Sequence, residues 1–178
     1  MSLDLPMLLI TPMNIFMFLG MYGALKKVNE SYALVALILA LLAVVLVIFS
    51  RPLVELVPLS EKYAAAATEA ERQQYLAAGE ALHALFNGTA WAVQTVLFML
   101  AGLLNCWLML RTTFFSRATA WCGIVISVIG LGFFIPTIGM ILLFLNTIGS
   151  VIWCLLLARD LFRLGWGHPV NVPQVAQY

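Results

Sequence analysis

The stretch of the chain that most restricts its fold runs from Ala118 to Ala158 and contains no charged side chain. A helix of about 20 residues crosses the roughly 30 Å hydrocarbon layer of a membrane, so this stretch is long enough for two crossings. The segment from Pro136 to Gly139, near its middle, is typical of a turn. The sequence therefore predicts a helix, a tight reversal and a second helix, both within a membrane.

The composition of the whole chain supports the same class of protein. Hydrophobic residues make up 63% of the chain and charged residues 10%, whereas charged residues are about a quarter of an average soluble domain. We therefore expect an all-α integral membrane helix bundle whose main partners are membrane lipids. The net charge of +1, without a cluster of Lys and Arg, argues against nucleic acid as a partner.

The apolar segments and their flanks suggest a single transmembrane domain over residues 1–164, followed by a flexible cytoplasmic tail at 165–178. The first residues lack the basic region and cleavage site of a signal peptide, so the first apolar segment is expected to remain as an anchor. Five transmembrane helices are predicted, at about residues 5–25, 32–49, 86–110, 118–135 and 139–158.

The basic residues between these segments indicate an orientation. Six of them fall on one side of the predicted bundle, whereas Asp4, the acidic segment 50–85 and the uncharged turn at Pro136 fall on the other. Because short cytoplasmic loops carry an excess of Lys and Arg, we expect the N-terminus outside the cell and the C-terminus in the cytoplasm. The six basic residues are Lys26, Lys27, Arg111, Arg117, Arg159 and Arg163.

The segment 50–85 is expected to form a helical extracytoplasmic extension before the third span, because it is rich in Ala, Leu and Glu. Thr68 and Glu71 have the T-x-x-E spacing of a capping box. A helix starting at Glu69 is expected to run into the third span, with Gly79 and Gly88 as possible bend points. Pro52 and Pro58 are expected to break the chain earlier and to leave residues 51–57 as a short amphipathic piece along the membrane interface.

A stripe of polar and aromatic side chains follows one face of the predicted third helix, at steps of three, four or seven residues. Polar groups are costly in hydrocarbon unless they are paired. The stripe is therefore either a set of hydrogen bonds between helices or a polar pocket that opens outward. Its members are Glu80, His83, Asn87, Trp91, Gln94, Phe98 and Asn105, and the expected partners on other spans are Asn14, Asn146 and Ser150.

Few residues suggest catalysis or cofactor binding. Glu80 and His83 are the only His–carboxylate pair near the bundle and could exchange protons, although most such pairs are solvated neighbours. We predict no cofactor: a membrane haem would need two axial histidines within the spans, and His168 lies in the tail. We also expect no metal site. The three cysteines, Cys106, Cys122 and Cys154, do not have the spacing of metal ligands, and we interpret them as small buried apolar residues.

Two further patterns have simple explanations. Small residues at positions 33, 36, 40 and 43 form a seam along the second span that allows another helix to approach closely. Trp107, Trp121 and Trp153 lie near the basic side of the predicted bundle, as interfacial aromatic anchors do.

Four short stretches resemble a prokaryotic multi-pass membrane family catalogued as domain of unknown function 4386. The similarity covers most of the chain, from about Pro12 to Gly165. The resemblance implies a protein of a bacterial or archaeal cytoplasmic membrane, and it implies no particular activity and no catalytic residues. The stretches are Leu76-Ala-Ala-Gly-Glu-Ala-Leu-His-Ala-Leu-Phe-Asn-Gly-Thr, Arg117-Ala-Thr-Ala-Trp-Cys-Gly-Ile, Ile135-Pro-Thr-Ile-Gly and Leu157-Ala-Arg-Asp-Leu-Phe-Arg-Leu-Gly.

Three functions agree with these patterns. The favoured one is a non-enzymatic protein that binds a lipid or small amphiphile, or assists its transport, through the polar stripe. The second is a structural or partner-binding membrane subunit, as a homo-oligomer or with another membrane protein, that uses the helical extension and the small-residue seam. The third and least favoured is an intramembrane enzyme with Glu80 and His83 as acid and base.

Overall fold

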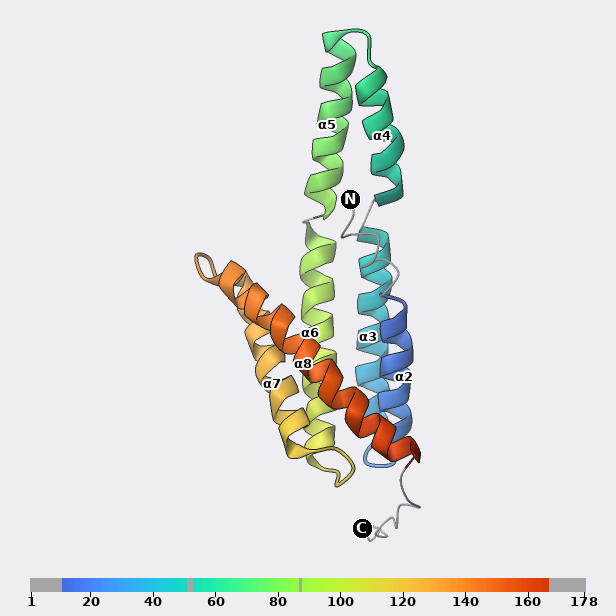
Figure 1. The fold of residues 1–178 in the computed structure, drawn as a ribbon, viewed down its shortest axis with the longest axis vertical. Helices are drawn as coiled ribbons and strands as arrows, with labels where there is room; N and C mark the ends of the chain where they lie inside the picture. The colour runs from blue at the N-terminus through green and yellow to red at the C-terminus, as the bar shows by residue number, and fades with distance from the viewer. Residues whose placement is uncertain (1–10, 51–52, 87, 167–178) are drawn as a thin grey trace.

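The computed structural model describes residues 11–50, 53–86 and 88–166, and every regular element in these ranges is a helix (Figure 1). The all-α prediction is therefore confirmed. The elements are α2 (Met13–Leu25), α3 (Glu30–Ser50), α4 (Leu53–Ala65), α5 (Glu69–Phe86), α6 (Thr89–Leu110), α7 (Arg117–Leu131), the 3₁₀ helix η1 (Gly132–Phe134) and α8 (Gly139–Trp166).

Four helical segments of the described chain are long and apolar enough to cross a membrane. α2 is also apolar but has 13 residues, fewer than a crossing requires. The beginning of the predicted first span and nearly all of the predicted tail lie outside the described residues. The four segments are Glu30–Ala65, Glu69–Leu110, Arg117–Phe134 and Gly139–Gly165.

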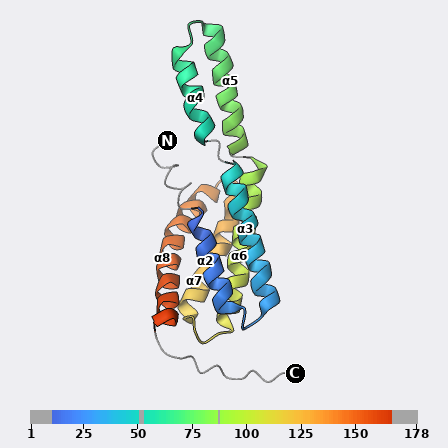
Figure 2. The same ribbon diagram turned by 90° about the vertical axis from the view of Figure 1, so that its right-hand side faces the viewer.

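Helix α6 is the element shared by the two halves of the bundle. On one side it packs against α3, which also packs against α2, and on the other side it packs against α7, which pairs with α8 (Figures 1 and 2). The small-residue seam of α3 is buried inside this arrangement, since Ala33, Ala36, Ala40 and Ala43 are at most 1% exposed. The seam therefore serves contacts within the chain and is not a surface for a partner.

Helices α4 and α5 form a hairpin that projects beyond the bundle (Figures 1 and 2). The predicted capping box is present at its turn: the Glu71 amide donates to Thr68 Oγ1 at 3.2 Å, and the Thr68 amide donates to Glu71 Oε2 at 3.3 Å. The helix does not continue unbroken into α6, because Gly88 has an extended conformation with φ −87° and ψ −156°.

The expectation that Pro58 breaks the chain is wrong. This residue lies inside α4 and does not end the helix, and α4 packs along α5 instead of forming a short piece at the interface. A proline within a helix removes one backbone hydrogen bond and strains the preceding turn.

The buried core lies at the end of the bundle where α6 turns into α7. Leu157 of α8 joins this core, together with Met21 and Leu25 of α2. From Met140 to Leu156 no residue of α8 is fully buried, whereas Leu157 and Asp160 are. α8 crosses the bundle obliquely, and its turn with α7 stands away from α6 (Figure 1). The fully buried part of α8 therefore lies at the end where α6 turns into α7, and the α7–α8 turn lies at the other end.

The reversal between α7 and α8 occurs where the sequence predicts it. Thr137 has a positive φ of 76°, and the Ile138 amide donates to the Pro136 carbonyl at 3.0 Å. This is the hydrogen bond of a tight three-residue turn. Gly139 follows directly, and a Cβ atom at this position would collide with the Phe133 carbonyl oxygen.

Candidate functional site

Polar side chains from four helices line a pocket of about 310 Å³ inside the bundle. The residues that line it belong to α2, α6, α7 and α8. Its apolar walls include Phe18, Phe98 and Leu143. The polar and indole groups that line it are Asn14 of α2, Trp91, Gln94 and Thr95 of α6, Ser127 of α7, and Asn146, Ser150 and Trp153 of α8.

Gln94 is the most unusual of these residues. It is 5% exposed, and its Oε1 atom is buried with no hydrogen-bond partner among the described residues. A buried acceptor without a donor destabilises a folded protein by about 1–3 kcal/mol. Such groups are rare in folded proteins, and each calls for an explanation, such as an ordered water or a bound molecule.

Asn146 has a structural contact instead. Its Nδ2 donates to the Ile126 carbonyl of α7 at 2.8 Å. Gly130 permits this close approach, because a Cβ atom there would lie 2.8 Å from Asn146 Nδ2. Asn146 therefore joins α8 to α7, as expected for a hydrogen bond between helices, and it also lines the pocket.

Trp153 lines the pocket, although the sequence suggested an interfacial anchor. Its indole lies against Gly123 of α7, where a Cβ atom would come within 2.5 Å of Trp153 Nε1. The Nε1 atom is buried and has no hydrogen-bond partner among the described residues. The pocket wall thus holds one unpaired acceptor, on Gln94, and one unpaired donor, on Trp153.

The structure divides the predicted polar stripe among separate environments. Gln94 and Trp91 face the pocket, whereas Asn105 is 2% exposed and donates within α6 to the Ala101 carbonyl at 2.9 Å. Glu80 and His83 are exposed on α5 and line a groove of about 490 Å³ between α4 and α5. The break at Gly88 separates these groups, because a common face requires one continuous helix. Asn87 lies outside the described residues.

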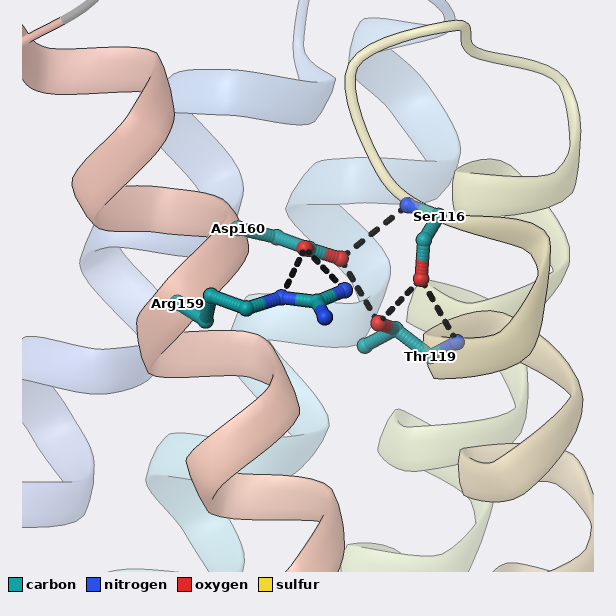
Figure 3. Close-up of polar contacts among 4 residues, drawn as sticks. All are labelled: Ser116, Thr119, Arg159 and Asp160. Atoms are coloured by element: carbon teal, nitrogen blue, oxygen red, sulfur yellow. Dashed lines mark hydrogen bonds and ion pairs between the residues drawn. The ribbon is translucent and has the colours of Figure 1, made fainter.

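A second polar cluster escaped the sequence analysis (Figure 3). Asp160 of α8 is 3% exposed, and its Oδ2 accepts hydrogen bonds from the Ser116 amide at 3.0 Å and the Thr119 hydroxyl at 2.6 Å. Arg159 donates to the other carboxylate oxygen at 3.1 Å. Ser116 caps α7, because its Oγ accepts from the Thr119 amide at 3.1 Å. A serine before a helix is a cap signal that a sequence can show. The sequence could not show that Asp160 of α8 lies beside this cap.

The chemistry available in the pocket is uncharged. None of the described residues that line it is an Asp, Glu, Lys, Arg or His. In the described ranges as a whole, no group of three His, Cys, Asp or Glu side chains could hold a metal ion. The pocket therefore offers hydrogen bonds and apolar contact to a bound molecule.

The comparisons with known proteins bear on the family. A family model described as "Domain of unknown function (DUF4386)" matches residues 5–159. This match confirms the resemblance noted in the sequence. Neither the curated proteins nor the solved structures give a match.

Proposed function

The chain belongs to the DUF4386 family, and we propose that it is an integral membrane protein that binds a lipid or another small amphiphile in the pocket between α2, α6, α7 and α8. The observation that carries the proposal is the buried, unpartnered Oε1 of Gln94 at the wall of this pocket. A bound molecule that donates a hydrogen bond would remove the cost of this atom.

The surroundings of the pocket support an amphiphile. Its walls combine aromatic and aliphatic side chains with a few polar groups, which is the usual composition of small-molecule sites. The outer surface of α8 is strongly apolar, with Leu155 68% exposed and Val151 59% exposed. An amphiphile in the surrounding membrane would therefore meet this surface without passing through water.

We also propose an orientation, with the N-terminus outside and the C-terminus in the cytoplasm of a prokaryotic cell. Arg111 and Arg117 flank the α6–α7 connection, and Arg159 and Arg163 lie near the end of α8, at the same end of the bundle. The hairpin of α4 and α5 then lies outside the cytoplasmic membrane. A phosphatase or fluorescent-protein fusion to the C-terminus tests this: fluorescence without phosphatase activity is expected, and the reverse pattern would contradict the orientation.

The first experiment is mass spectrometry of the protein extracted directly into native-lipid nanodiscs. Wild type is expected to retain a molecule that Gln94→Leu loses. Gln74→Leu is the matched control, because it makes the same substitution at an exposed position of α5. A molecule retained equally by all three proteins, or by none, would contradict binding at Gln94.

The groove of the α4–α5 hairpin supports a second candidate, a partner-binding membrane subunit. Leu76 is 45% exposed and Tyr63 is 43% exposed beside this groove. Crosslinking in native membranes through a cysteine introduced at Leu76 would detect a protein partner or a second copy. Recovery of the monomer alone would argue against this candidate.

A further inference from the structure

Basic side chains gather at the end of the bundle that lies opposite the α4–α5 hairpin. We propose that this end binds the head groups of anionic phospholipids, with Arg111 as the central contact to the lipid phosphate. The inference goes beyond the proposed function, because it concerns other residues and depends neither on the pocket nor on Gln94. It requires that this end of the bundle lies at a membrane surface.

Charge is distributed unequally between the two ends of the molecule. The α2–α3 and α6–α7 connections and the end of α8 lie at one end, and the hairpin lies at the other (Figures 1 and 2). Within the described ranges, the first end carries six basic and two acidic residues, whereas the hairpin carries two basic and five acidic residues. The six basic residues are Lys26, Lys27, Arg111, Arg117, Arg159 and Arg163.

The two acidic residues at this end do not neutralise its surface. The carboxylate of Asp160 is buried and already accepts from Ser116, Thr119 and Arg159. Glu30 is exposed and forms no ion pair with another described residue. Of the six basic side chains, only that of Arg159 is in an ion pair within the part of the chain that the structure describes. The other five are exposed, so an external anion would find them without a counter-charge.

Arg111 is held in a position suited to a phosphate. It directly follows α6, whose 22 residues are long enough to cross a membrane, so its side chain would lie near the head groups. Its Cζ atom lies 3.8 Å from the centroid of the Trp107 ring. Stacking uses the face of a guanidinium and leaves the N–H groups at its edge, which match two oxygens of a phosphate. The Arg111 side chain has no hydrogen-bond acceptor among the described residues.

The stack also brings Arg111 beside the turn that carries two more cations. Tyr32, in the first turn of α3, packs edge-on against the Trp107 ring, with the ring centroids 5.2 Å apart. The Tyr32 amide donates to Asn29 Oδ1 at 3.1 Å, which fixes the start of α3 directly after Lys26 and Lys27. Several basic residues beside transmembrane helices attract anionic head groups, each contributing to the affinity.

The apolar surface beside these residues favours a lipid over a soluble anion. On α3, Leu34 is 44% exposed, Val35 is 45% exposed and Ile38 is 48% exposed. These side chains follow Tyr32 along the helix, away from the basic end. A phospholipid whose phosphate meets Arg111 would lay its acyl chains on this surface, whereas a free phosphate would gain nothing from it.

Two phospholipids with the same chains test the proposal: dioleoyl phosphatidylglycerol, which is anionic, and dioleoyl phosphatidylcholine, which has no net charge. Their binding to the full chain in a neutral detergent is measured by native mass spectrometry. Wild type is expected to bind the anionic lipid about tenfold more tightly, and this ratio is expected to fall when the ionic strength rises from about 0.05 M to about 0.5 M.

Three variants locate the site. Arg111→Gln is expected to weaken binding of phosphatidylglycerol about fivefold and to leave that of phosphatidylcholine unchanged. Arg111→Lys keeps the charge but loses the planar fork, so its affinity is expected to fall between those of wild type and Arg111→Gln. Arg72→Gln is the matched control, because it removes an exposed arginine of the hairpin, and it is expected to bind both lipids as wild type does.

The outcomes separate this proposal from the alternatives. Equal affinities of the two lipids for wild type would overturn it, without reference to the folding of any variant. Displacement of phosphatidylglycerol by inorganic phosphate, but not by chloride at the same ionic strength, would show a site for a soluble anion and would also overturn it. Equal effects of Arg111→Gln and Arg72→Gln would contradict the role of Arg111. Gln94→Leu is expected to retain the lipid preference, so failure of the proposed function leaves this result intact.

Discussion

The Thr119 hydroxyl donates a 2.6 Å hydrogen bond to the buried carboxylate of Asp160 and so joins the first turn of α7 to the last part of α8 (Figure 3). The carboxylate also accepts from the Ser116 amide, at the N-terminus of α7. A negative charge is stabilised at a helix N-terminus by the unpaired amides and the helix dipole. The α7–α8 pair is thus fastened at the end opposite to its turn.

Asp160→Leu is expected to lower the free energy of unfolding by about 2–4 kcal/mol, because it leaves the Ser116 amide and the Thr119 hydroxyl without an acceptor in a buried place. Thermal unfolding in detergent measures the loss. Arg159→Gln is the control, since Arg159 is 46% exposed and an exposed ion pair contributes about 1 kcal/mol at most. Equal losses in the two variants would contradict the central role of the carboxylate.

Gly102→Ala is expected to destabilise the contact between α6 and α7. A Cβ atom at Gly102 would lie 2.8 Å from Ser127 Oγ, and overpacking of this kind costs about 1–3 kcal/mol. In a protein that also carries Ser127→Ala, Gly102→Ala is expected to raise the free energy of unfolding instead. The obstructing oxygen is then gone, and Ala favours a helix over Gly by about 0.5–1 kcal/mol. Additive effects in a double-mutant cycle of unfolding free energies would refute the clash.

Gln94→Leu is expected to stabilise the ligand-free protein by about 1–3 kcal/mol, because it removes a buried acceptor that has no donor. The measurement is unfolding after delipidation. Gln74→Leu, at an exposed position, is expected to change stability by less than about 0.5 kcal/mol. A less stable Gln94→Leu protein would show that the amide is satisfied within the fold.

Thr68→Ala is expected to loosen the start of α5, since its side chain accepts from the Glu71 amide. Loss of an N-cap costs about 0.5–2 kcal/mol. Hydrogen exchange is expected to rise at the first turn of α5 and to remain unchanged in α6 and α7. Arg72→Ala, one turn further on and exposed, serves as the control, and faster exchange there but not in Thr68→Ala would argue against the cap.

Two substitutions in the turn between α7 and α8 are expected to change the free energy of unfolding in opposite directions. Gly139→Ala is expected to destabilise the protein, because the added methyl group meets the Phe133 carbonyl. Thr137→Gly is expected to raise the free energy of unfolding by about 1 kcal/mol, since a β-branched residue is strained at φ 76°. Thermal unfolding of both variants checks the pair, and a loss in Thr137→Gly would show that its side chain has an unrecognised contact.

Much of the fold could be predicted because the relevant interactions are local. The uncharged stretch after Ala118 predicted two helices and a reversal, and α7, the turn and α8 follow that plan. The capping box at Thr68 and Glu71 was read from four residues and is present. Helix starts and tight turns depend on neighbours within about four residues, which a sequence displays directly.

The candidate site was only partly predictable. Gln94, Asn14 and Asn146 were singled out as polar residues in apolar segments, and the structure brings all three to one pocket. Glu80 and His83 were assigned to the same face, but the break at Gly88 places them on the hairpin. Trp153 looked like an anchor at the membrane surface, because the direction of its ring depends on the contact with Gly123.

The sequence by itself determined the class of protein, the helices and the apolar character of their surfaces, because these follow from composition and from periodicity along one segment. Only the tertiary structure decided which polar groups meet. Thr119 and Asp160 are 41 residues apart in the chain, and the pocket is formed by side chains from four helices. Such meetings depend on how helices cross and tilt, which is set by the shapes of all the side chains between them.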